Sequence, residues 1–100
     1  MTVVSPDMRE LRGELDLAGV PYEIDDDDDD VYGLQTHIER TGITSKGGRW
    51  VSVIYAWSRD EDGDKRFESD GGRFGYLEMQ VDEGDHRAVT VEEVMEVVMK

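Results

Sequence analysis

The chain contains no cysteine, and only two prolines and two histidines, in 100 residues. Without cysteine it has no disulfide framework, no thiolate metal site and no thiol nucleophile. Its apolar runs are far too short to span a bilayer, and it does not open with the basic and then apolar segments of a signal peptide. We therefore expect a cytoplasmic protein.

Basic side chains are also scarce, with 11 lysines and arginines against 25 aspartates and glutamates, for a net charge of −14. Nucleic acid and anionic membranes both require a basic footprint, so the composition argues against binding either of them directly. The charge instead favours a cationic partner, either a basic protein surface or a divalent metal ion.

Catalytic and metal-binding patterns are missing as well. Neither His37 nor His86 has a second histidine at ligand spacing, and we expect both at the surface, His37 on the polar face of a strand and His86 in a loop. The serines lack a nucleophile-elbow context, and the glycine-rich segment 71–75 fits no phosphate-binding pattern. We predict that the protein is not an enzyme and that it has neither a cofactor nor a dedicated metal-binding site.

One segment begins like a calcium loop. Asp60, Asp62 and Asp64 have the alternating spacing of such a loop. Continuing the count places Lys65 where that loop needs glycine and Gly71 where it needs glutamate. We interpret the segment as a solvated acidic turn, and opportunistic divalent binding here or by the aspartate run stays an alternative.

Two helices are predicted, one at each end of the chain. Ser5 is an expected N-cap for a helix over residues 6–18, after a frayed segment 1–5, and Gly19 supplies a stop. Thr90 and Glu93 have capping-box spacing and predict a second helix that reaches about residue 99. The inward stripes are Met8, Leu11, Leu15 and Ala18 in the first helix, and Val91, Val94, Met95 and Val98 in the second.

Alternating apolar residues predict strands between the helices, over residues 20–24, 31–38, 49–58 and 73–81. Pro21 places the first at a sheet edge, and the strand 49–58 is expected to be central because both its faces are apolar. Trp50 and Trp57 should point to opposite faces, which leaves one of them on the open side. In the strand 31–38 we expect Leu34, Thr36 and Ile38 on the inner face, and Gln35, His37 and Glu39 outside.

Together these elements predict a single α+β domain over residues 1–100. Its sheet should be small and antiparallel, with three or four strands in a meander and both helices on one face. Turns or loops are expected at 41–48, 59–72 and 82–88, and the segments 25–30 and 59–72 are acidic connections.

Six consecutive aspartates, Asp25–Asp30, are the most unusual feature of the chain. A core cannot hold them, because a buried unpaired carboxylate costs several kcal/mol, so we expect a loop or the exposed end of an edge strand. An extended chain advances about 3.3 Å per residue, close to the ~3.4 Å phosphate spacing along one DNA strand. The run is either a solvating loop without a partner or a mimic of nucleic acid. In the second case the predicted partner-binding residues are Glu23, Asp25, Asp26, Asp27, Asp28, Asp29, Asp30, Asp60, Glu61, Asp62, Asp64, Asp82, Glu83 and Asp85.

The chain also resembles a type of small protein. Its opening segment 8–15, the segment Gly19–Glu23 and the closing segment Thr90–Met95, together with its acidity, are similar to accessory proteins of phages and other mobile elements. Among these it most resembles anti-CRISPR proteins that mimic DNA. The resemblance implies a non-enzymatic inhibitor in a bacterial cytoplasm that occupies the target-DNA path of a CRISPR effector, with type I slightly favoured. Alternatives are an acidic inhibitor of a nuclease or modification enzyme, and a carboxylate-rich metal-binding protein or small hydrolase.

Overall fold

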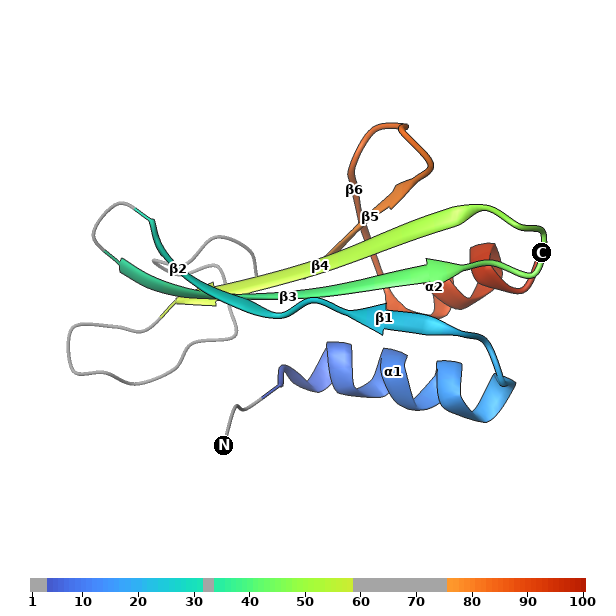
Figure 1. Ribbon diagram of the computed structural model, residues 1–100, viewed down its shortest axis with the longest axis horizontal. Helices are drawn as coiled ribbons and strands as arrows, with labels where there is room; N and C mark the ends of the chain where they lie inside the picture. Colours follow the sequence, from blue (N-terminus) through green and yellow to red (C-terminus); the bar gives the residue numbers. More distant parts are fainter. Residues whose placement is uncertain (1–3, 32–33, 59–75) are drawn as a thin grey trace.

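The computed structural model describes residues 4–31, 34–58 and 76–100 (Figure 1). Its elements follow the chain in the order α1 (Pro6–Ala18), β1 (Tyr22–Ile24), β2 (Asp27–Val31), β3 (Leu34–Thr44), β4 (Trp50–Ser58), β5 (Leu77–Val81), β6 (Arg87–Val89) and α2 (Val91–Val98). No helix in this part of the chain combines the length and apolar content needed to cross a membrane.

The strands form one antiparallel sheet in the order β1-β3-β4-β5-β6, with β2 also paired to β3. Tyr22 pairs with Ile43 and Asp27 pairs with Ile38, so β1 and β2 keep one register along β3. They are two parts of one edge strand, interrupted at Asp25 and Asp26. The predicted α+β meander is confirmed. The described residues form six strands instead of three or four, because the edge strand is interrupted and a short β6 begins within the expected loop 82–88.

Both helices pack against the same face of the sheet, as predicted (Figure 1). Helix α1 has the predicted bounds: the Ser5 hydroxyl accepts a hydrogen bond from the Met8 amide at 3.2 Å, and Gly19 has a left-handed φ of 69°. The buried core joins the two helices to the inner faces of β3, β4 and β5, through Met8, Leu11, Leu15, Ile43, Val51, Val53, Tyr55, Leu77, Met79, Val94 and Val98 among others.

Helix α2 begins as predicted and ends one residue earlier, at Val98. Its capping box is formed, since the Thr90 hydroxyl accepts from the Glu93 amide and the Glu93 carboxylate accepts from the Thr90 amide, both at 3.2 Å. The helix C-terminus is held by the β3–β4 turn, where the Lys46 amide donates to the Val98 carbonyl at 2.9 Å.

The prediction for β3 was wrong in extent and in orientation. The strand continues to Thr44, through a segment expected to be a turn, and Gly42 lies inside it. His37 and Glu39 were expected outside, but they are 5% and 0% exposed. They belong to the face that meets α1, which supplies polar partners that the strand pattern alone does not reveal. The turn follows at residues 45–49, where Gly48 has a φ of 85°.

Trp50 lies on the open face of the sheet, opposite the core residue Val51, and is 45% exposed. Its ring covers Gly42: a Cβ added there would lie 2.4 Å from the indole Cζ2. The prediction of a tryptophan on the open side is therefore confirmed for Trp50. The side chain of Trp57 lies outside the described part of the molecule, as do residues 59–75, which comprise the predicted acidic connection 59–72 and the first three residues of the predicted strand 73–81.

Candidate acidic interaction surface

The aspartate run is part of the sheet. Asp27 to Asp30 pair with Ile38 to Gln35 of β3, in strand β2. Aspartate is a poor strand former, which favoured the prediction of a loop. The structure instead shows the other predicted alternative, an edge strand. The long partner strand β3 provides the hydrogen-bonding template that local propensity does not.

A buried arginine holds the start of this acidic strand. Arg12, on the inner side of α1, is 8% exposed, and its guanidinium donates to both carboxylate oxygens of Asp26. The distances are 2.7 Å for Nη2–Oδ1 and 3.2 Å for Nη1–Oδ2. The same guanidinium donates from Nε to the Thr41 hydroxyl at 3.0 Å and from Nη2 to the Arg40 carbonyl at 3.3 Å. Four hydrogen bonds thus join α1 to the edge of the sheet.

Asp26 also replaces a missing rung of the β-ladder. The Asp25 amide donates to the Arg40 carbonyl at 3.0 Å, as a regular strand would. The Arg40 amide donates instead to Oδ1 of Asp26, at 3.1 Å. Because a side-chain oxygen satisfies this amide, the strand can break at residues 25 and 26 without losing its register.

The predicted partner-binding acids therefore differ in their surroundings. Glu23, Asp25 and Asp27 are exposed, whereas the Asp26 side chain is 20% exposed and bound to Arg12. The backbone of Asp28–Asp30 is in β2, and their side chains lie outside the described part. Asp60, Glu61, Asp62 and Asp64 also lie outside the described residues.

The acids of the β5–β6 turn are all exposed, but one of them is structural. Asp82 has a left-handed φ of 52°, a conformation that aspartate tolerates better than most residues. Its amide donates to the Trp50 carbonyl at 2.7 Å, and its Oδ1 accepts from the Trp50 amide at 3.3 Å. Asp82 thereby extends the β4–β5 pairing, as Asp26 does at the other edge, and leaves Glu83 and Asp85 as the outward acids of this turn.

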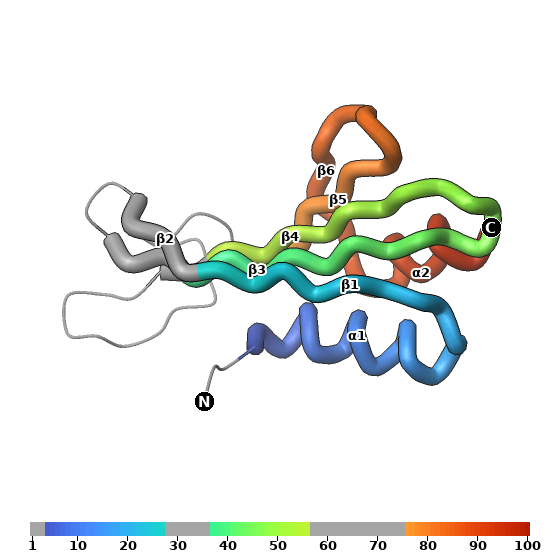
Figure 2. The backbone as a smooth tube through the Cα atoms, in the orientation of Figure 1, coloured from blue at the N-terminus to red at the C-terminus, as the bar shows by residue number. Residues whose placement is uncertain are grey.

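The structure does not bring the two described acidic segments together. Strands β1 and β2 form one edge of the sheet, beside β3, while the β5–β6 turn lies toward the other edge (Figure 2). A partner that contacts the aspartate strand thus meets a surface separate from Glu83 and Asp85.

A buried polar cluster lies beneath the N-terminus of α1. The Glu39 carboxylate accepts from the Ser5 amide at 2.8 Å and from the Ser5 hydroxyl at 2.7 Å. His37 Nε2 lies 3.6 Å from Glu39 Oε2. The serine hydroxyl donates to the carboxylate, and the three residues are at most 5% exposed. This arrangement anchors the start of the helix to the sheet.

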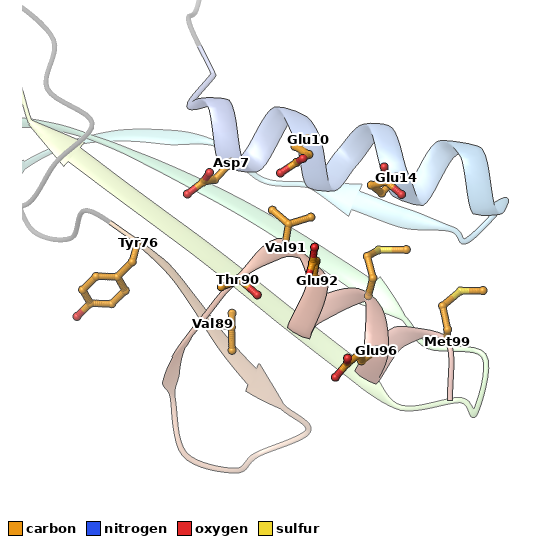
Figure 3. A pocket seen from close by; sticks show the side chains of 11 residues that line it. Asp7, Glu10, Glu14, Tyr76, Val89, Thr90, Val91, Glu92, Glu96 and Met99 are labelled. Atoms are coloured by element: carbon orange, nitrogen blue, oxygen red, sulfur yellow. The ribbon is translucent and has the colours of Figure 1, made fainter.

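A second acidic surface was missed by the sequence prediction. Helices α1 and α2 border a groove of about 1050 Å³ (Figure 3). Its acidic residues are Asp7, Glu10, Glu14, Glu92 and Glu96. The signal was present in the sequence, because residues 7, 10 and 14, like residues 92 and 96, share one helical face. Only the fold shows that the two faces border the same groove.

Among the residues that the structure describes, no group of three or more histidine or acidic side chains is arranged to hold a metal ion. Comparison of the chain with protein-family models finds no match. Comparisons with curated proteins and with solved structures find none either. The function is therefore inferred from the geometry and the charge of this chain.

Proposed function

We propose that this protein is a non-enzymatic inhibitor that presents a DNA-like acidic strand to a basic nucleic-acid-binding protein. The observation that carries the proposal is the state of the aspartate run, which is a paired strand anchored by Arg12 and Asp26. A loop would have to be ordered on binding, at about 1–2 kcal/mol per residue for the backbone. A strand already fixed by the sheet avoids most of that cost.

The geometry of an extended strand supports the same proposal. The four aspartates of β2, at about 3.3 Å each, extend over roughly 13 Å, with a linear charge density close to that of one DNA strand. The net charge of −14 adds a long-range field that speeds encounter with a cationic surface. Such a partner would gain a similar electrostatic free energy from binding this protein as from binding DNA, so the protein could displace the DNA.

The proposed target is a CRISPR effector complex of type I in a bacterial cytoplasm, as the resemblance to anti-CRISPR proteins implies. Effectors of this kind hold nucleic acid in positively charged channels, which suit an acidic strand. The same strand fits the DNA-binding face of a nuclease or modification enzyme, which is the alternative target.

The test is a competition experiment with a purified type I effector complex. We expect the protein to bind the complex at low salt and to displace a labelled target duplex in a gel shift. Binding should weaken steeply as salt is raised, because the contact is electrostatic. Absence of binding at low salt would exclude a type I CRISPR effector as the target. Binding that leaves the duplex in place would contradict DNA mimicry.

A further inference from the structure

The groove between α1 and α2 combines charge and apolar surface in a way that the aspartate strand does not. Its rims carry five carboxylates, three from α1 and two from α2, and none of its described lining residues is basic. Figure 3 shows these acids along both helices, with Val91 between the rims and Met99 at one end. The described part of each helix also lacks a basic residue in its last turn.

This arrangement brings five acidic side chains to the border of one groove in the free protein. Carboxylates that border one groove repel one another, and none of the described lining residues is a lysine or arginine that would offset the repulsion. Cations supplied by a partner would relieve it. The rims therefore select a partner with positive charge on both sides of the segment that enters.

The floor of the groove is apolar. Val89 and Val91 are buried beneath it, while Met95 is half-buried and Met99 is 44% exposed. Methionine is flexible and polarisable, and it is common on surfaces that accept apolar side chains of varied shape. A purely ionic partner would leave this floor exposed to water, whereas a partner with apolar side chains would cover it.

We propose that this groove binds a basic amphipathic helix of a protein partner, with its apolar face on Met95 and Met99 and its lysines or arginines against the acidic rims. A helix satisfies its own backbone hydrogen bonds, which an extended segment could not do over a floor of valine and methionine side chains. The lining residues of α1, from Asp7 to Glu14, extend over about 12 Å, as do the eight residues of α2, which matches about two turns of a partner helix. The groove is a separate surface from the aspartate strand, so this proposal does not depend on DNA mimicry.

The probe is a fluorescein-labelled 14-residue peptide of leucine and lysine patterned as an amphipathic helix. Its control is a peptide of the same composition in an order that has no apolar face. Fluorescence anisotropy at 150 mM salt should show the patterned peptide binding at least about tenfold more tightly than the control, because only it covers the floor.

Two variants with equal charge separate the groove from the general field of the protein. The groove variant carries D7N, E10Q, E14Q, E92Q and E96Q. The strand variant carries D25N, D27N, D28N, D29N and D30N, and keeps Asp26 with Arg12. We expect the groove variant to bind the patterned peptide about tenfold more weakly than the wild type, and the strand variant to change by less than about threefold.

A third variant, Met95→Ser with Met99→Ser, leaves every charge in place and should weaken binding of the patterned peptide about fivefold. Three results would overturn the proposal. These are equal binding of the two peptides, equal losses in the two charge variants, and a concentration-dependent dimer that the methionine variant dissolves. The last would assign the groove to a second copy of this chain.

Discussion

Arg12 and Asp26 form a two-bond ion pair across 14 residues of sequence, with Nη2 2.7 Å from Oδ1. The pair fastens helix α1 to the interruption between β1 and β2. It makes the first part of the aspartate run structural, while Asp25 and Asp27 on either side are exposed. The start of the acidic strand is therefore held by one arginine, in addition to the pairing of β2 with β3.

Replacing Arg12 by alanine should destabilise the fold. Breaking a buried ion pair by removing one partner costs about 3–5 kcal/mol, and since Asp26 is partly exposed we expect about 2–3 kcal/mol here. Urea denaturation would measure it. Arg12→Lys should recover only part of the loss, because an ammonium cannot bind both carboxylate oxygens in the same way.

Arg9 provides the control for this prediction. It lies on the exposed side of α1 and donates one hydrogen bond, from Nη2 to the Val4 carbonyl at 3.3 Å. Arg9→Ala should change the free energy of unfolding by less than about 0.5 kcal/mol. Equal effects of the two alanine variants would show that the Arg12–Asp26 contact is unimportant for stability.

Ser5 is predicted to contribute more than an ordinary helix cap. Its hydroxyl accepts from the Met8 amide and also donates to the buried Glu39 carboxylate. Ser5→Ala should cost about 2–3 kcal/mol, since it removes a cap and one donor to a buried charge. The matched change at the exposed cap of α2, Thr90→Ala, should cost about 1 kcal/mol. Chemical denaturation of both variants would test the difference, and equal costs would count against the Ser5–Glu39 contact.

The fold class, both helices and the central place of β4 could be predicted from sequence, because apolar spacing and capping residues are local signals. The inner face of β3 could not. His37, Glu39 and Thr41 form a polar pattern typical of an outer face. The partners of Glu39 and Thr41, which are Ser5 and Arg12, lie about 30 residues earlier in the chain. The role of Asp26 could not be predicted either. Its partner Arg12 is distant in the sequence, and six identical residues give no sign that one of them is paired.

Tyr22 should make the stability of the protein sensitive to alkaline pH. Burial raises the pKa of its hydroxyl above the ordinary value, and the hydrogen bond to Asp16 and the charge of that carboxylate add to the rise, while Arg12 opposes it. The folded protein therefore holds this proton more tightly than the unfolded chain. The stabilisation of the folded protein by this proton is complete below the pKa of about 10 that tyrosine has in the unfolded chain. It is lost as the pH rises through the pKa of Tyr22 in the folded protein.

Tyr22→Phe tests that pH dependence. The variant should lose less stability than the wild type between pH 9 and pH 11, on the order of a few tenths of a kcal/mol, because it has no proton to release at this position. Thermal or urea unfolding across this range would measure the difference. Parallel curves for the two proteins would show that Tyr22 does not titrate differently in the folded state.

Gly42 is predicted to be required for the position of Trp50. A side chain at residue 42 would collide with the indole ring, which would have to turn toward solvent. Gly42→Val gains strand propensity but loses the packing of the ring, for an expected net cost of about 1 kcal/mol. In a Trp57→Phe background, the remaining emission should shift to the red and become more accessible to acrylamide. Unchanged quenching would mean that the ring does not lie over Gly42.

We propose that an anchored strand of aspartates acts as a DNA-like surface, and a comparison of binding affinities is the sharpest test of this role. The affinity of a purified type I effector complex is compared for the wild type, the strand variant and the equally charged groove variant at one salt concentration. We predict that the strand variant binds at least about tenfold more weakly, while the groove variant stays within about threefold of the wild type. A strand variant that binds as tightly as the wild type would contradict the claim.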